Sequence, residues 1–449
     1  MTQHSSPWID RFRGLDEPKL LRERAFLPAR PLVDLGRDLQ EYACDRLKLE
    51  LDSIFAPTES ALKVLLTWVE RARSYALTHY QNQQRFLSRC YDQEVEVEDS
   101  ILFCLTGLAG VGKSQIRKAF FRILPPDGTV EVIDHGRLVF PLTAGRLIVV
   151  KSRQSVLQIY RTLARAGAFE RGLSGEPAWL RECQQWLYQC GVCAVGLDEL
   201  QFLTQSEKAN TLVARVLMAV SYLGPPAFFT CNYSLGHRMM RRPQEERQRL
   251  LARIHVLHPD PYDSECWRLV LREFQNSAPD VFRFDIVGEA RQLWNLTAGI
   301  KRNLAQLFVL AYRQVRRKSA STVSITDLLA AYHSIEFCTQ RQDVELLFTY
   351  GIKGVKGRSD LSCPFSVSSV EAEKYTDALQ MARREKVASA AMKAVMTKEE
   401  RQSVQAIQTA AAPKVVKQKQ GNVHELKIPA SKTLEALQRA GQKFKEDLQ

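Results

Sequence analysis

A short glycine-rich stretch contains the residues best suited to binding phosphate. Residues 107–114 read Gly-Leu-Ala-Gly-Val-Gly-Lys-Ser, which is the phosphate-loop spacing G-x-x-x-x-G-K-S/T. Glycines let the backbone turn so that its N–H groups face a β-phosphate, and the following helix adds its positive dipole end. We expect Lys113 to reach the β- and γ-phosphates and the Ser114 hydroxyl to bind Mg²⁺. The predicted ATP-contacting residues are Gly107, Leu108, Ala109, Gly110, Val111, Gly112, Lys113, Ser114 and Gln115.

A pair of carboxylates downstream fits the second half of nucleotide chemistry. The apolar run at residues 192–197 ends in Asp198 and Glu199. Asp198 is placed to hold Mg²⁺, either directly or through water, and Glu199 to polarise the water that attacks the γ-phosphate. An acidic pair after a strand is common by itself, but its position after a phosphate loop makes it informative. The two motifs together predict an ATPase that uses ATP and Mg²⁺.

Two further positions match those at which AAA+ ATPases sense the nucleotide. The apolar run 226–231 ends in Asn232, where these proteins carry the sensor-one residue. Gly299 and Arg302 have the G-x-x-R spacing of the sensor-two motif, in which an arginine of the lid closes on the nucleotide. Lys301 is the second choice for that role. The alternatives are an asparagine that starts a turn and a basic residue on a solvated lid face.

An arginine-rich stretch at residues 241–253 precedes a short strand. AAA+ rings place here the arginine that reaches the γ-phosphate bound to the neighbouring subunit. A guanidinium suits this role because it is planar, forked and always charged. Arg253 is the first choice and Arg249 the second, and a solvated basic helix face is the alternative.

The elements needed to position these residues follow from the hydrophobic pattern. Apolar runs at 101–105, 147–150, 192–197 and 226–231 read as buried parallel strands, each followed by a helical pattern. The predicted fold class is therefore α/β, an AAA+ P-loop NTPase with a parallel sheet and a small helical lid. The expected divisions are an N-terminal arm (1–32), a helical N-terminal region (33–99), the α/β core (100–262), the lid (263–358), and a linker with a basic, mostly helical or disordered tail (359–449).

The arm and the tail have the composition of segments that meet partners. The arm is polar with spaced apolar anchors such as Trp8 and Phe12, so it is either ordered against a partner or neighbouring subunit, or frayed. The tail beyond residue 413 is rich in lysine and glutamine and poor in aromatic residues, which indicates a segment that is mobile until bound, or one without a role.

The charge of the chain points to a polyanionic partner. The formal net charge is +13 and the pI is about 9.3, as expected for a protein that binds nucleic acid. The loop after the second core strand begins Lys151-Ser152-Arg153, and we expect these residues to contact the backbone of duplex DNA without reading its sequence. The alternative is that they only solvate the start of a helix.

The remaining features describe an ordinary cytoplasmic protein. There is no apolar run long enough to span a membrane and no secretory leader. The cysteines are scattered, which predicts reduced thiols. Cys190 and Cys193 have redox spacing but no second pair to complete a zinc site, and we interpret them as plain cysteines.

The motifs resemble one family in particular. The run Asp198-Glu199-Leu200-Gln201-Phe202-Leu203 is similar to the acidic strand of the TnsC/TniB group of transposition ATPases, and residues 294–312 look like the lid of that group. The resemblance covers roughly residues 33–358, and Gly196 departs from it because large residues usually precede the acidic pair. Proteins of this group form ATP-bound rings or helical filaments on duplex DNA. They link a target selector (TnsD or TniQ) to a transposase (TnsA and TnsB), which the C-terminal tail tends to face.

The resemblance therefore implies an ATP-dependent, DNA-binding regulator of transposition that self-associates. Two alternatives stay open. One is a replication initiator or helicase loader with the same fold. The other is an NTP-dependent signalling scaffold that does not bind DNA, against which the net charge argues mildly.

Overall fold

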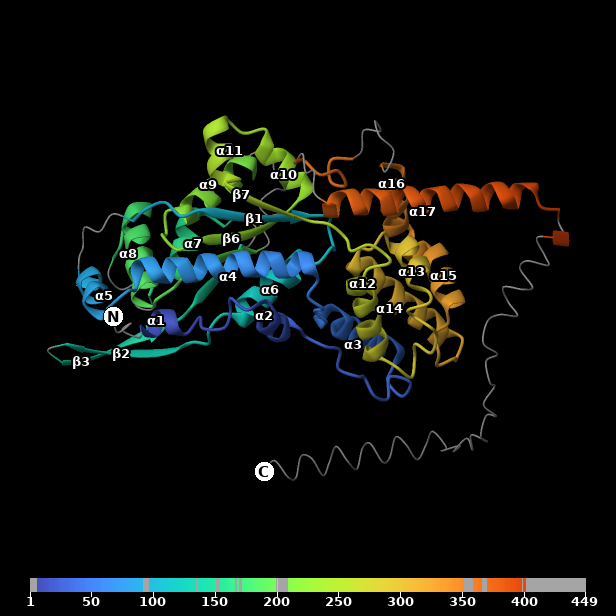
Figure 1. Cartoon of the computed structure of the whole chain (residues 1–449), viewed down its shortest axis with the longest axis horizontal. Coiled ribbons are helices and arrows are strands. Elements are labelled where there is room, and N and C mark those ends of the chain that lie inside the picture. The colour runs from blue at the N-terminus through green and yellow to red at the C-terminus, as the bar shows by residue number, and fades with distance from the viewer. Residues whose placement is uncertain are drawn as a thin grey trace, which may run out of the picture. The chain divides into compact units, whose positions relative to one another are not determined.

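The structure is a computed structural model of the chain. Two compact units are present, Met1–Thr397 and Lys398–Gln449, and all helices and strands given below belong to the first. The structure describes residues 6–91, 97–134, 136–150, 154–165, 168, 172–198, 200, 209–350, 358–365, 370–397 and 399–400. Figure 1 shows the ribbon with its element labels.

The centre of the first unit is a five-stranded parallel sheet with the order β4-β5-β6-β1-β7. The phosphate-loop strand β1 lies between two neighbours, so that Gly107 at its end is level with Asn232 on β6 and Leu257 on β7. The apolar runs expected as strands do form strands. Their bounds are β1 (Leu102–Gly107), β4 (Gly145–Val149), β5 (Ala194–Asp198), β6 (Ala227–Asn232) and β7 (Arg253–Leu257).

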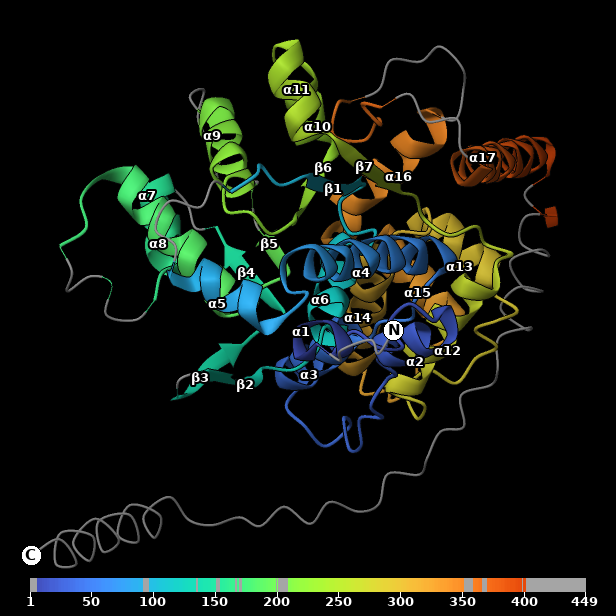
Figure 2. The same ribbon diagram turned by 60° about the vertical axis from the view of Figure 1, so that its left-hand side comes forward.

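Helices cover both faces of this sheet, and alternate strand residues point to each face. On β1, Phe103 packs with α4 and α6, whereas Cys104 faces the cluster that includes α7 to α10. Figures 1 and 2 show the sheet with helices on either side. The helices are α4 (Glu59–His79), α6 (Lys113–Ile123), α7 (Val156–Leu163), α8 (Gly175–Gln189), α9 (Ala209–Ser221), α10 (Tyr233–Met240) and α11 (Gln244–Leu250).

A helical lid follows the sheet, as the sequence predicts. Amphipathic helices pack their apolar faces together around Trp267, Trp294 and Phe308, which are fully buried. The fold class is thus the predicted one, a parallel α/β core with a helical lid. The lid helices are α12 (Glu265–Ser277), α13 (Ala290–Thr297), α14 (Lys301–Arg317), α15 (Ile325–His333) and α16 (Cys338–Tyr350), with a short 3-10 turn at Ile335–Phe337.

The expectation that the arm is either frayed or ordered only by a partner is wrong for its described part. Trp8 and Phe12 are buried within the chain itself, and the Trp8 ring lies 4.6 Å from that of Phe86. Burial of two large aromatic side chains supplies several kcal/mol, roughly 1.5–3 kcal/mol each, which is enough to hold a short arm in place. Its helices are α1 (Pro7–Asp10) and α2 (Pro18–Ala25).

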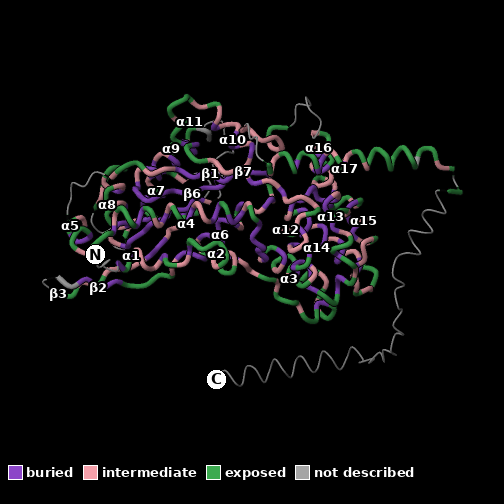
Figure 3. The backbone as a smooth tube through the Cα atoms, viewed as in Figure 1, coloured by how far each residue is buried: buried purple, intermediate pink, exposed green. Residues whose placement is uncertain are grey.

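The helical N-terminal region does not pack as a body of its own. Helix α3 (Gln40–Ser53) packs against α14 and α12 of the lid, whereas α4 packs against α6 and β7 of the core. Tyr312 of α14 donates a hydrogen bond to the Leu35 carbonyl just before α3. This region therefore joins the core to the lid, and Figure 3 shows buried residues along α4 and in the lid helices. Helix α5 (Gln83–Tyr91) completes it.

Sequence reasoning missed an antiparallel hairpin between α6 and β4. Strands β2 (Gly128–Asp134) and β3 (Gly136–Leu142) pair with each other and not with the main sheet. Their alternating apolar residues include Val130 and Val132, which are buried. The Pro-Pro-Asp-Gly sequence at 125–128 indicates a turn. The alternation of apolar and polar residues after it is the sequence signal that predicts these strands.

The C-terminal part of the first unit is the long helix α17 (Val370–Val395), which lies in the region 359–449 that is predicted to be a linker and a mostly helical or disordered tail. Its first half buries Tyr375, Ala378 and Leu379 against the lid. Tail residues from 401 onward lie outside the described residues, and so does the segment Lys151-Ser152-Arg153 that is predicted to contact DNA. Among the described residues, none of the helices has the length and apolar character needed to span a bilayer.

Gly196, the departure noted in the sequence, is explained by close packing in the sheet. A Cβ atom at this position would lie 2.4 Å from the Phe121 ring of α6, which is far inside van der Waals contact. Strand β5 therefore needs the smallest side chain at this point so that α6 can lie against it. The glycine at position 196 is therefore explained by packing, and Asp198 still lies at the end of the strand.

We predict that Gly196→Ala lowers the free energy of unfolding by roughly 1–3 kcal/mol, because the new methyl group overpacks the interface with α6. Gly128→Ala is the matched control, since a Cβ there meets nothing within 4 Å. The control is expected to change stability by less than about 0.5 kcal/mol. Urea unfolding followed by circular dichroism measures both, and equal stabilities of the two variants would contradict this account of Gly196.

Candidate nucleotide site

The phosphate loop lines a cavity of about 410 Å³ between the core and the lid. Residues of the loop meet there with others that are far apart in the sequence. Gly107 and Leu108 do not line the cavity, but their carbonyl groups accept hydrogen bonds from Lys113. The predicted residues that line the cavity are Ala109, Gly110, Val111, Gly112, Lys113, Ser114, Gln115, Asp198, Asn232, Lys301 and Arg302.

Lys113 lies folded back on the phosphate loop. Its ammonium donates hydrogen bonds to the carbonyls of Gly107 at 2.9 Å and Leu108 at 2.7 Å, and the residue is only 7% exposed. Burial, with a smaller contribution from the nearby Arg302 charge, lowers the pKa of Lys113 to about 8. A phosphate group would supply the negative charge that this ammonium lacks among the loop carbonyls.

Asp198 and Asn232 stand at the carboxyl ends of neighbouring strands, where polar residues of a parallel sheet gather. Asp198 lines the cavity and forms an ion pair with Arg117 of α6, with 2.5 Å between Oδ2 and Nη2. Asn232 also lines the cavity, beside the end of β1. Sequence reasoning missed Arg117, although its position one helical turn after Lys113 was a usable signal. Glu199 lies outside the described residues.

The lid touches the phosphate loop directly at Gly110. The Arg302 backbone N–H donates a hydrogen bond to the Gly110 carbonyl at 3.2 Å. Gly110 has φ +82°, and a Cβ there would lie 2.7 Å from Cβ of Arg302, so both its conformation and its space require glycine. The predicted sensor-two residue therefore belongs to the turn of the lid that meets the loop. Its neighbour Lys301 is ion-paired with Asp260 at 3.5 Å.

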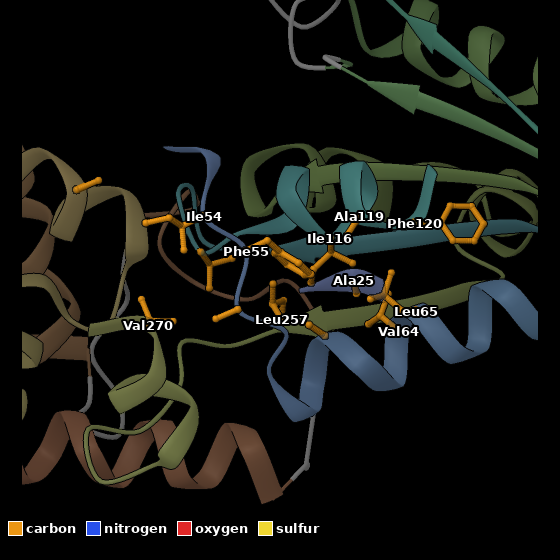
Figure 4. Close-up of a cluster of buried hydrophobic side chains, with 14 of the residues drawn as sticks. Ala25, Ile54, Phe55, Val64, Leu65, Ile116, Ala119, Phe120, Leu257 and Val270 are labelled. Atoms are coloured by element: carbon orange, nitrogen blue, oxygen red, sulfur yellow. The ribbon is translucent and has the colours of Figure 1, made fainter. Parts of the chain in front are cut away.

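Part of the cavity lining is apolar and suits a nucleotide base. The segment between α3 and α4 contributes Ile54 and Phe55, and the lid contributes Val270 and Phe274. Figure 4 shows Ile54, Phe55 and Val270 near Leu257 at the end of β7. Apolar walls with a few polar groups are typical of small-molecule sites. Sequence reasoning missed this wall, because the segment precedes the phosphate loop by some 50 residues and has no motif of its own.

Two predicted arginines lie away from this cavity. Arg253 starts β7 and is level with Phe103 at the opposite end of β1 from the phosphate loop, where it is exposed. Arg249 is ion-paired with Asp99. Neither can act on a nucleotide in the cavity of its own chain, which is compatible with action on a neighbouring subunit.

The oxygen atoms that line the cavity suit a magnesium ion that would be coordinated mainly by nucleotide phosphates and water. Ser114 and Asp198 both line the cavity, and Mg²⁺ prefers such donors together with phosphate oxygens and water. Among the described residues, no group of three or more His, Cys, Asp or Glu side chains could hold a metal by itself. Bound there, the ion would neutralise charge on the phosphates. Cys190 and Cys193 are both buried.

We predict that Lys113→Met raises the free energy of unfolding at pH 7 by about 1–3 kcal/mol while abolishing nucleotide binding, because it removes a desolvated charge. The folded-state pKa of about 8 lies below the ordinary 10.5, so the unfolded chain binds more protons between these values. Wild-type stability should therefore rise across this pH window, and the advantage of the variant should shrink.

Chemical unfolding at pH 7 and at pH 9.5 measures this difference. Lys118→Met is the control, since Lys118 is exposed on the same helix, and it should change stability by less than about 0.5 kcal/mol at either pH. A Lys113→Met variant less stable than wild type at pH 7 would show that the hydrogen bonds of the lysine outweigh its desolvation.

Comparison with known proteins finds similarity to solved structures. No protein-family model and no curated protein sequence matches the chain. The Aeropyrum pernix ORC1 protein in complex with DNA is 19% identical, with a TM-score of 0.37, over 60% of this chain and 67% of that one. The Aeropyrum pernix ORC2 protein is 13% identical, with a TM-score of 0.37, over 71% and 94%. The Thermotoga maritima RuvB branch migration motor is 13% identical, with a TM-score of 0.32, over 62% and 74%.

At identities and scores this low, no residue role is transferred from these proteins. The assignment of the fold depends on features of this chain itself, namely the strand order around β1, the phosphate loop at its end and the helical lid docked on that loop. That combination is the α/β fold of an AAA+ P-loop NTPase.

Proposed function

We propose that this protein is an ATPase that binds duplex DNA and regulates transposition. The observation that supports the ATPase part of the proposal is that the phosphate loop, Asp198, Asn232 and Arg302 all line one cavity. These residues come from the core and the lid, and their types suit phosphate, Mg²⁺ and the sensing of a γ-phosphate. The apolar part of the cavity lining suits the adenine base.

In the proposed reaction, Lys113 and the loop N–H groups bind the phosphates while Ser114 and Asp198 hold Mg²⁺. Glu199 follows Asp198 directly in the sequence and is proposed as the base that orients the attacking water. Arg302 approaches from the lid, so that hydrolysis can be linked to how the lid sits on the loop. Arg253, or Arg249 as second choice, completes the site of a neighbouring subunit in a ring or filament.

DNA binding is supported by the net charge of +13. We propose that Lys151, Ser152 and Arg153 contact the phosphate backbone. Two arginines that follow this segment, Arg161 on α7 and Arg165 just after α7, lie over the rings of Trp179 and Trp186 at 5.3 and 5.4 Å. These stacked guanidiniums are held in place by the protein, which makes the lysine–arginine segment before the helix the better candidate for DNA.

The role in transposition is proposed from the resemblance of the acidic strand and the lid to the TnsC/TniB group. The partners would be a TnsD- or TniQ-like selector and a TnsA/TnsB-like transposase, the latter meeting the tail that follows α17. A replication initiator or helicase loader would share the ATPase activity and the DNA contacts, and would differ only in the partner protein on which it acts. A signalling scaffold would bind ATP without DNA.

We predict that the protein sediments with duplex DNA only when ATP and Mg²⁺ are present. Lys113→Ala should lose both nucleotide and ATP-dependent DNA binding, whereas Glu199→Gln should bind both and lose turnover, because an amide cannot act as a base. Lys151→Ala with Arg153→Ala should weaken binding equally on unrelated duplexes and flatten the slope of log affinity against log salt by roughly one to two units. Sedimentation at several salt concentrations, with phosphate release, measures all of these.

Failure of the wild-type protein to sediment with any duplex would favour the scaffold. Wild-type turnover by Glu199→Gln would remove the proposed base.

We also predict that Arg253→Ala spares ATP binding by the isolated subunit but lowers hydrolysis and ATP-driven assembly. Mixing Arg253→Ala with Glu199→Gln protein should partly restore turnover, since some mixed interfaces then hold one intact site. Arg283→Ala is a control, because Arg283 is a surface arginine of the lid ion-paired with Asp280. Phosphate release across a series of mixing ratios tests the idea, and an absence of restoration at every ratio would count against an arginine acting between subunits.

A further inference from the structure

Arg117 is a charged residue buried under the phosphate loop. It lies on α6 one turn after Lys113, and its side chain is 2% exposed. The partner in its ion pair is Asp198, whose side chain is 13% exposed and which lines the nucleotide cavity. Arg117 lines the same cavity. A buried guanidinium therefore contacts the carboxylate proposed to hold the metal.

Stability alone does not account for an arginine at this position. Apart from Lys113, the other buried residues of α6 are apolar, namely Ile116, Ala119, Phe120 and Ile123. Desolvating a guanidinium and a carboxylate costs several kcal/mol per ion in typical cases, and apolar residues of similar volume are often as stable or more so. The ion pair between Arg117 and Asp198 therefore needs an explanation other than stability.

We propose that Arg117 is a positioning residue that orients the Asp198 carboxylate and competes with the divalent cation for it. This inference rests on the proposed ATPase function and adds to it a rule for when the cation binds. Arg117 contacts Oδ2 of Asp198, so the carboxylate is held in one orientation with its negative charge largely compensated.

The other charges around the cavity act in the same direction. The described carboxylates that line it are those of Asp52, Asp198 and Asp260, and Asp260 is already paired with Lys301. Lys113 and Arg302 add positive charge, and Ser114 is neutral. The described residues by themselves therefore offer a divalent cation little net negative charge, and the phosphates of a nucleotide would supply more. The cation should enter with the nucleotide and should bind poorly without it.

The test measures how much free Mg²⁺ is needed for half-maximal binding of a fluorescent ADP analogue. Arg117→Gln should lower that concentration roughly tenfold, which corresponds to about 1.4 kcal/mol, because Asp198 regains its full charge. Arg117→Lys should stay within about twofold of wild type, since a positive charge remains beside the carboxylate. Arg122→Gln is the matched control on the same helix, where the arginine donates to the Ala25 carbonyl instead, and it should behave as wild type.

The outcomes separate this inference from the proposed function. If the wild-type protein binds no nucleotide at saturating Mg²⁺, the ATPase proposal itself fails. If it binds, and Arg117→Gln has the Mg²⁺ requirement of wild type and of Arg122→Gln, Arg117 serves only the fold and the inference is overturned. Arg117→Met, which fills a similar volume without charge, is measured in place of a glutamine variant that cannot be purified. Unfolding of both variants would likewise assign the ion pair to stability and overturn the inference.

Discussion

The register of β1 with its two neighbours is the constraint on which the rest of the site depends. Parallel pairing sets Gly107 level with Asn232 on one side and Leu257 on the other. The phosphate loop, the polar end of β6 and the passage from the core to the lid therefore leave the sheet at the same edge. Helices bury both faces of the sheet, so a slip by one residue would exchange the two apolar faces and is strongly disfavoured.

The second constraint is electrostatic. The cavity gathers Lys113, Arg117, Lys301 and Arg302, and two of its carboxylates are used to pair with these cations. Burial disfavours the charged form of Lys113, which shows in its lowered pKa. An excess of positive charge in a partly desolvated space is costly until an anion enters. The excess of positive charge that lowers the stability of the fold thus favours the binding of a polyphosphate.

The lid takes part in the site through both its backbone and its side chains. Arg302 hydrogen-bonds the Gly110 carbonyl through its N–H, and α14, which carries Arg302, is also the helix on which α3 packs. The segment that follows α3 then forms the apolar wall of the cavity and continues into α4 on the core. A change in how the lid sits on the loop would therefore reach the core through a continuous set of packed elements, and such elements can carry coupling between distant parts of a fold.

Local patterns in the sequence were enough to predict the phosphate loop, the strands that end in Asp198 and Asn232, and the helical lid with Arg302. Each of these depends on a short spacing or on a periodicity, and backbone conformation follows such signals closely. The alternation at 128–142 was also a local signal, but it was overlooked. Only the tertiary structure decided that Trp8 and Phe12 are buried, that Phe121 requires glycine at 196, that Ile54 and Phe55 form a wall of the cavity, and that Arg117 contacts Asp198. These contacts join residues distant in the chain, and they exist because strand register and helix packing bring particular side chains together, which no pattern within one segment encodes.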